Sequence, residues 1–154
     1  MMTLLFAFLI GLFAGLRSLT APAVTAWAAY LGWLKLERPL SLIGSLPSVV
    51  IFTVFAIGEL VADKLPKTPN RTSPLGLIAR ITTGAITGAC IATSGGQGPI
   101  PGALLGVLGG VVGCFAGFQA RTRLVRATGK PDIYVALVED VVAIAGCLWI
   151  ASQF

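Results

Sequence analysis

The sequence has no histidine, only three cysteines and few charged residues, and each scarcity narrows the possible functions. Histidine is absent from all 154 residues, which excludes zinc sites built on imidazole and acid–base catalysis by histidine. Cys90, Cys114 and Cys147 lie in apolar runs without CxxC spacing. Their odd number and surroundings favour small buried side chains over metal ligands or disulfides, so no cofactor is expected.

Charged residues make up only 11% of the chain, whereas soluble domains contain about 25%. Hydrophobic residues make up 56%, and the mean hydropathy is +0.91. The net charge of +5 would suit nucleic acid, but the sequence has no basic cluster with interleaved aromatic residues to bind it. The composition therefore predicts an integral membrane protein whose partner is the lipid bilayer and not nucleic acid.

The apolar residues fall into six runs separated by short polar connections. A helix that crosses a bilayer needs about 20 residues, so these runs fill the chain and leave no room for a second domain. The predicted fold is all-α: a single polytopic transmembrane helical bundle over residues 1–154 with five or six short segments. The runs cover approximately residues 1–16, 22–34, 40–62, 74–93, 101–118 and 133–151.

The first two runs are too short to cross a bilayer as separate helices. Each would reach only about 21 Å, compared with a hydrocarbon core of roughly 30 Å. Residues 17–22 interrupt them, and Thr20 there is suited to cap the second helix. This pattern favours a re-entrant or broken N-terminal helical hairpin over a single span.

The distribution of lysine and arginine predicts the orientation. Two connections carry seven basic residues, whereas the other side of the membrane receives only Lys35 and Arg38. By the positive-inside rule, both basic connections are expected to be cytoplasmic, in a bacterial inner membrane. With an N-terminal hairpin, both ends of the chain then lie outside. The seven residues are Lys64, Lys67, Arg71, Arg121, Arg123, Arg126 and Lys130.

Glycines recur at four-residue spacing and so share helix faces. Such faces allow backbones to approach closely, which is how helices in lipid gain contact area. We expect a compact bundle that also forms a homo-oligomer through a glycine face, foremost that of Gly102, Gly106 and Gly110. The other ladders are Gly11 and Gly15; Gly84 and Gly88; and Gly109, Gly113 and Gly117.

Several charged residues lie within or beside the apolar runs. A charge at the centre of a membrane helix costs about 2.5–3.5 kcal/mol even on the more lenient scales, so such residues need partners or water. Glu59, Arg80 and Glu139 lie at similar estimated depths, about 7–12 Å from the basic side. A hairpin would bring Arg17 to the same depth. We therefore predict a mixed cluster of arginines and carboxylates in the cytoplasmic half.

Three strings of residues resemble a known family. They are GLRSLTAP from Gly15, GExxADKLPxTPxRT from Gly58 and ALVED from Ala136. The chain resembles, over nearly its full length, a family of small bacterial integral membrane proteins with plant relatives that is described only as a domain of unknown function. The resemblance implies that the charged residues are the signature of the family, but it names no activity or substrate.

Three functions are compatible with these features. The leading hypothesis is a channel or secondary transporter for an ion or a small anionic solute, because broken helices and intramembrane charges mark transport paths. The alternative is a structural or assembly protein whose charges are paired internally. A third is an enzyme acting on a lipid phosphate, with a metal at Glu59 and Asp63. The residues expected to bind substrate or line an ion path are Arg17, Glu59, Asp63, Arg71, Arg80, Arg121, Glu139 and Asp140.

Overall fold

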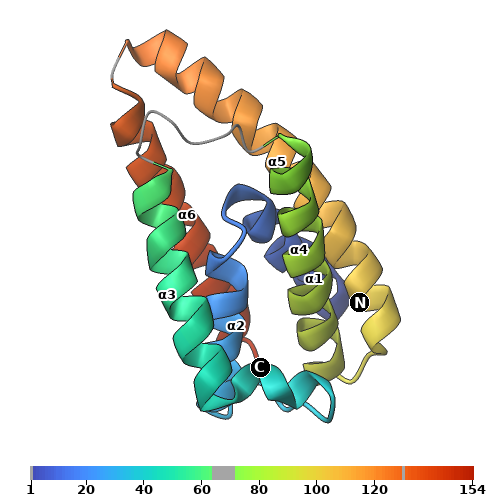
Figure 1. The fold of residues 1–154 in the computed structure, drawn as a ribbon. Helices are drawn as coiled ribbons and strands as arrows, with labels where there is room; N and C mark the ends of the chain where they lie inside the picture. The colour runs from blue at the N-terminus through green and yellow to red at the C-terminus, as the bar shows by residue number, and fades with distance from the viewer. Residues whose placement is uncertain (1, 64–71, 130) are drawn as a thin grey trace.

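The computed structural model describes residues 2–63, 72–129 and 131–154, and the regular structure in these ranges is entirely helical (Figure 1). This confirms the predicted all-α bundle. In the described ranges, six α-helices and one short 3₁₀ helix follow one another. They are α1 (Met2–Leu16), α2 (Thr20–Tyr30), η1 (Leu40–Gly44), α3 (Leu46–Ala62), α4 (Pro74–Ser94), α5 (Pro99–Thr128) and α6 (Asp132–Ala151).

Helices α1, α4 and α5 form a tightly packed unit, which we call the three-helix unit. Its packing depends on glycine. A Cβ atom on Gly106 of α5 would lie only 2.0 Å from the carbonyl oxygen of Gly84 on α4. One on Gly11 of α1 would lie 2.2 Å from the carbonyl oxygen of Gly106. Backbones thus meet directly at these positions, which no larger residue permits.

The glycine ladder of α5 is used within a single chain. Gly102, Gly106 and Gly110 are all buried, and their faces are covered by α1 and α4. The prediction that copies associate through this ladder is therefore wrong. Four-residue spacing identifies a face that packs against protein, but it does not say whether the partner is in the same chain.

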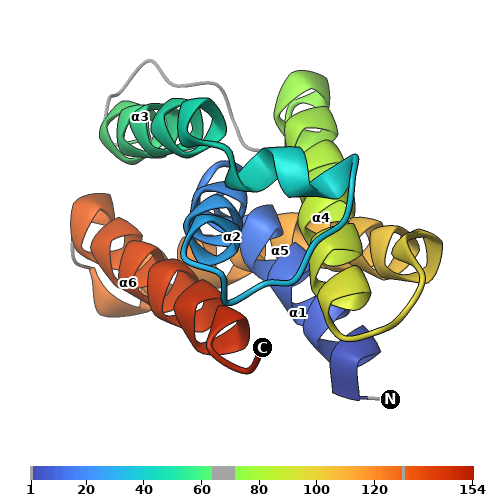
Figure 2. The same cartoon turned by 90° about the horizontal axis from the view of Figure 1, so that it is seen from below.

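Helices α2, α3 and α6 form a second group. Figure 2 shows α2 near the centre of the molecule, with α3 and α6 on the side away from α4. The N-cap of α3 is Ser45, whose hydroxyl accepts a hydrogen bond from the Ser48 N–H at 3.4 Å. Ser45 separates α3 from η1, so the third apolar run is divided into two helices.

The hairpin predicted for the N-terminal region is confirmed. Helices α1 and α2 are separated by three residues, Arg17 to Leu19, which we call the break. The start of α1 lies beside the end of α4, since the Thr3 side chain approaches Gly95. The segment after α2 returns to the same end, where the Lys35 N–H donates to Ser94 Oγ at 3.1 Å. The break therefore lies inside the molecule.

Helix α5 is longer than its apolar run. The run ends near residue 118, but the helix continues through the basic segment to Thr128 and ends at Gly129, which has φ = +62°. The basic connection predicted over residues 120–131 is thus mostly helical. The reason is that alanine, arginine and leucine, which are frequent there, are good helix formers.

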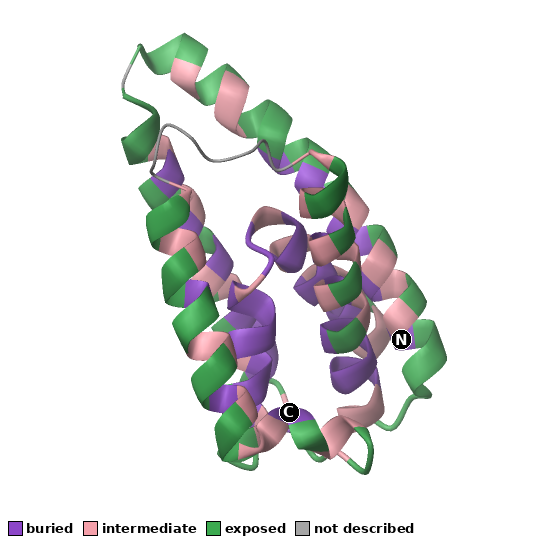
Figure 3. Ribbon diagram, viewed as in Figure 1, coloured by how far each residue is buried: buried purple, intermediate pink, exposed green. Residues whose placement is uncertain are grey.

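Three helices among the described residues are long and apolar enough to cross a membrane, namely α4, α5 and α6. Helices α1 and α3 are shorter apolar helices. The outer surfaces carry many exposed large hydrophobic side chains, and Figure 3 shows buried residues concentrated on the inward faces of α1 and α2. These features are those of a helical membrane protein that presents apolar side chains to lipid.

Candidate functional site

Arg17 occupies the break and is completely buried. Its backbone N–H still bonds to the Phe13 carbonyl at 2.9 Å, so the residue closes the last turn of α1. Its guanidinium forms an ion pair through Nη1 with Asp63, the residue that directly follows α3. Nη2 lies 2.6 Å from Oδ1 of Asp140 on α6. One arginine at the end of α1 thus joins two helices of the second group.

The Glu59 carboxylate caps the N-terminus of α2. Oε1 accepts hydrogen bonds from the Ser18 N–H at 2.9 Å and from the Ser18 hydroxyl at 2.6 Å, and Oε2 accepts from the Leu19 N–H at 2.9 Å. The cap predicted for Thr20 is wrong, because Thr20 is the first helical residue and its buried Oγ1 has no hydrogen-bond partner. A carboxylate from α3 replaces a local cap.

Arg80 forms hydrogen bonds at the C-terminal end of α1, on the other side of the break from Glu59. From α4, its Nε donates to the Gly15 carbonyl at 3.0 Å, and Nη1 donates to the Gly76 carbonyl at 3.0 Å. Gly15 lies in the last turn of α1, where carbonyl groups lack helical partners and carry partial negative charge. Arg80 Nη2 lies 4.0 Å from Oε1 of Glu59. A cation at the end of α1 and an anion at the start of α2 thus stabilise the interrupted helix.

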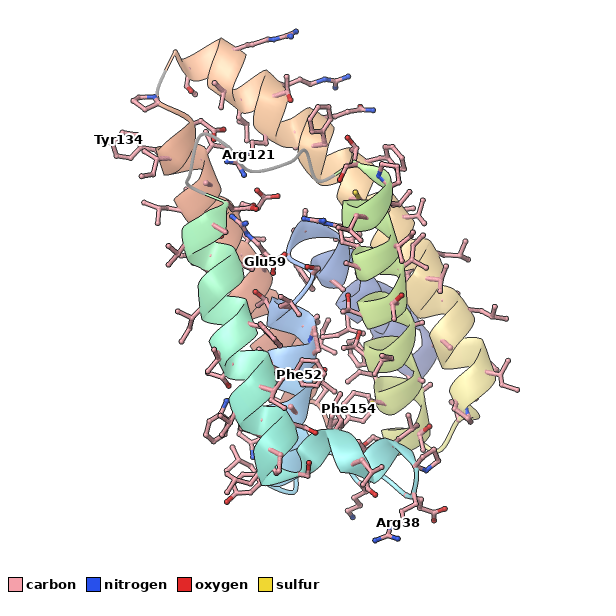
Figure 4. All side chains as sticks on the ribbon, in the orientation of Figure 1. Arg38, Phe52, Glu59, Arg121, Tyr134 and Phe154 are labelled. Carbon is pink, nitrogen blue, oxygen red and sulfur yellow. The ribbon has the colours of Figure 1, made fainter. Side chains whose placement is uncertain are left out.

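Arg121 of α5 extends the cluster toward α6. Its Nε donates to Oδ1 of Asp132 at 2.8 Å, and Nη2 contacts the other oxygen of that carboxylate. Nη1 lies 3.5 Å from Oε2 of Glu139 and 3.8 Å from Oδ2 of Asp63. Figure 4 shows Glu59 and Arg121 between the two helix groups, whereas Arg38 points outward at the opposite end.

We call this set of residues the charged interface. Its positive and negative members come from different parts of the fold. The arginines come from the three-helix unit: Arg17 directly follows α1, and the other two belong to α4 and α5. The carboxylates come from the second group: Asp63 directly follows α3, and the others belong to α3 and α6. Among the described residues it contains Arg17, Arg80 and Arg121 together with Glu59, Asp63, Asp132, Glu139 and Asp140.

Seven of the eight residues expected at the site therefore take part in ion pairs between helices. Arg17, Asp63, Arg121, Glu139 and Asp140 form one network, and Arg80 lies beside Glu59. The eighth, Arg71, lies outside the described residues. The charged interface also contains two contributors that the sequence analysis missed. Ser18 donates twice to Glu59, and Asp132 binds Arg121. Asp132 could have been found, because it opens the helix that begins at the same end of the molecule as Arg121.

An apolar groove runs between the C-terminal half of α5 and the N-terminal half of α6. Its volume is about 420 Å³. Leu124 of α5 and Val138 of α6 contribute to its walls, and Leu16 at the end of α1 also lines it. Arg121 and Glu139 line the same groove, so it gives access to the charged interface.

The metal site considered for Glu59 and Asp63 does not form among the described residues. Glu59 directs both oxygens to N–H and O–H donors of the break, and Asp63 pairs with Arg17. No group of three or more Cys, Asp or Glu side chains in the described ranges is arranged to hold a metal ion. The geometry is that of paired charges and not of a cluster of carboxylates around a cation.

A family model for a domain of unknown function, DUF4126, matches residues 4–153. The chain therefore belongs to this family, as the three sequence strings suggested. No curated protein and no solved structure matches the chain.

Proposed function

We propose that this protein is a secondary transporter for a small ion and that the charged interface is its ion-binding site. The observation that carries the proposal is the separation of charge between the two helix groups. Arginines on the three-helix unit face carboxylates on α3 and α6. Contacts of this kind hold two bodies together in one state and release them when a proton or ion changes the charge balance.

The packing of the two groups supports relative motion between them. The three-helix unit has backbones in direct contact at Gly11, Gly84 and Gly106, so its helices cannot slide without clashes. Helices α3 and α6 contain no comparable glycine contact with the unit in the described ranges, apart from Gly146 beside the Phe13 ring. We infer that α2, α3 and α6 move as a group against a rigid unit.

The break supports a binding role for the same region. In transporters, interrupted helices place their N-terminal and C-terminal ends at the binding site, where the partial charges of the backbone meet the ion. Here the N-terminal end of α2 meets Glu59, and the C-terminal end of α1 meets Arg80. Protein surrounds the break on several sides, which is the condition for irregular backbone at membrane depth.

The alternative function is structural. The many ion pairs of the charged interface favour it, because a network of paired charges would join the helix groups without transporting anything. Buried pairs of this kind add little net stability over apolar packing, yet removing one partner is strongly destabilising, by about 3–5 kcal/mol. The two functions can therefore be distinguished by replacing a charged residue with a neutral one and measuring both stability and ion flux.

Flux measured in proteoliposomes tests the proposal. The purified protein is reconstituted with a pH-sensitive dye inside, and nitrate or chloride is added outside in an acidic buffer. We expect the interior to acidify faster than in liposomes without protein, because the carboxylates carry protons with the anion. An Arg38→Gln variant, changed at the opposite end, should match the wild type, whereas Arg80→Gln should abolish the effect. Wild-type rates equal to those of empty liposomes would contradict the proposal for these anions.

A further inference from the structure

We infer that the pocket holding the Glu59 carboxylate is the binding site of a small monovalent oxyanion, and that Glu59 leaves this pocket when it takes up a proton. We call it the Ser18 pocket. It comprises the backbone N–H groups of Ser18 and Leu19, the Ser18 hydroxyl and the Arg80 guanidinium. The inference rests on the proposed function and specifies its substrate class and coupling.

The hydrogen-bonding groups of the Ser18 pocket are donors, which is what an anion requires. Three hydrogen bonds of 2.6–2.9 Å converge on the Glu59 carboxylate from two consecutive residues. Arg80, which is 5% exposed, places Nη2 4.0 Å from the same group. Bonds from such donors to an ionised oxygen are roughly twice as strong as those between neutral groups. Glu59 thus occupies the position that a free anion would take.

Two further buried groups beside the pocket have no hydrogen-bond partner. Thr20 is 4% exposed and its Oγ1 is unbonded; it directly follows Leu19. Arg17 is fully buried and its Nε is unbonded; it directly precedes Ser18. Leaving a buried donor without a hydrogen-bond partner is unfavourable. A planar anion with three oxygens, such as nitrate or bicarbonate, offers acceptors for more donors than Glu59 alone uses.

Exchange of Glu59 for an anion preserves the charge of the region. When Glu59 gains a proton, it loses one negative charge, and the entering monovalent anion restores it. Arg80 of α4 faces Glu59, and Arg17 at the break pairs with Asp63, which lies one turn along the chain from Glu59. Asp140 of α6 faces Arg17, and Glu139 of α6 faces Arg121 of α5.

Because none of these neighbours changes its net charge over a complete cycle, one proton and one anion cross together. The transport cycle is then electroneutral, and membrane potential does not drive it. A divalent anion such as sulfate would add an uncompensated charge at this depth, which is costly in a membrane interior. The Ser18 pocket therefore selects monovalent anions.

Rescue of a pocket variant by free anions tests the inference. Glu59→Ala empties the Ser18 pocket, and thermal unfolding of the purified variant is followed with increasing formate or nitrate at neutral pH. Saturable binding at ten times the Kd should raise the midpoint by roughly 3–6 °C. Sulfate at matched ionic strength should have no saturable effect. Glu37→Ala, altered at an exposed carboxylate, should not respond to formate or nitrate in this way.

A second variant covers the case in which Glu59→Ala does not fold. Glu59→Gln keeps an amide oxygen that accepts one of the backbone N–H groups, so it should fold and be stabilised by the same anions at higher concentration. The inference is overturned if neither variant gains stability from formate or nitrate, or if sulfate stabilises them equally.

These results separate the inference from the proposed function. Stabilisation by nitrate with no flux through the wild-type protein would retain the anion site and reject transport. Nitrate flux through the wild type without stabilisation of either variant would retain transport and place the anion elsewhere.

Discussion

Glu59 of α3 accepts two hydrogen bonds from Ser18, one from its backbone N–H at 2.9 Å and one from its hydroxyl at 2.6 Å. The two residues are 41 positions apart in the chain. The contact places a carboxylate where the N-terminus of α2 would otherwise have unsatisfied N–H groups inside the protein. The charged interface therefore supports both the fold of the break and the site that we assign to it.

The Ser18 hydroxyl should contribute measurably to stability. Ser18→Ala removes one hydrogen bond to a charged acceptor but leaves the backbone bond, so the free energy of unfolding should fall by about 1.5–3 kcal/mol. Chemical denaturation in mild detergent measures this change. Ser152→Ala is the matched control, because Ser152 is exposed and its hydroxyl bonds to the carbonyl of Trp149 at the end of its own helix. The control should change stability by less than about 0.5 kcal/mol.

Glycine packing in the three-helix unit gives a second prediction. Gly106→Ala would place a methyl group against the backbone of Gly84, so unfolding should become easier by about 1–3 kcal/mol or more. Gly58→Ala provides the control, because Gly58 is an exposed helical residue and a Cβ added there would have open space around it. It should be neutral or slightly stabilising. Equal behaviour of the two variants would show that the close glycine contacts do not stabilise the bundle.

The pair formed by Arg17 and Asp140 should be energetically coupled. In a double-mutant cycle of Arg17→Gln and Asp140→Asn, we expect an interaction energy of about 1–3 kcal/mol, because the residues are in contact and buried. The same cycle with Arg17→Gln and Glu37→Gln should give less than about 0.5 kcal/mol, since distant sites are additive. Urea titrations of the four proteins in each cycle provide the values. Additivity of the first pair would contradict the contact.

The N-terminal hairpin and the charged cluster could be predicted from the lengths of the apolar runs and the positions of single charged residues within them. The short first runs and the depth of Arg17 indicated a hairpin, and the depths of Glu59, Arg80 and Glu139 indicated a cluster. Both inferences rest on distance along a helix, which sequence provides directly. The hydrogen bonds of Glu59 to Ser18 could not be predicted, because they depend on how two helices far apart in the chain meet.

The sequence-based predictions that were wrong or incomplete have physical causes, which Arg121, Asp132 and Gly106 illustrate. Arg121 and Arg126 suggested a connection, yet side chains of this type favour helices, so α5 continues to Thr128. Asp132 is the first residue of α6 and binds Arg121, a pairing that the sequence did not predict. Gly106 was assigned to an interface between copies, because periodicity does not distinguish contacts within a chain from contacts between chains.

The orientation of the chain gives another prediction. In a background without cysteines, Arg126→Cys should be protected from a membrane-impermeant thiol reagent added to intact cells, and Gln153→Cys should be labelled readily. The excess of basic residues on one side is the reason, since such segments stay in the cytoplasm. Labelling of position 126 from outside with protection of position 153 would invert the topology.

The transport account and the structural account differ most clearly at Glu139. Glu139 lies beside the groove and 3.5 Å from Arg121, which also binds Asp132. Glu139→Gln therefore leaves Arg121 with a carboxylate partner, and the protein should remain folded. In the transport account, Glu139 passes protons between the groove and the charged interface, so Glu139→Gln should lose flux. In a purely structural network there is no flux to lose.

The most direct test is the rate of proton-linked nitrate uptake by Glu139→Gln, measured in proteoliposomes beside the wild type and normalised to folded protein. The account predicts uptake by the wild type that does not depend on membrane potential. It also predicts at least a tenfold loss in Glu139→Gln, with a thermal midpoint within a few degrees of the wild-type value. Uptake by Glu139→Gln equal to that of the wild type, or no uptake by the wild type, would contradict it.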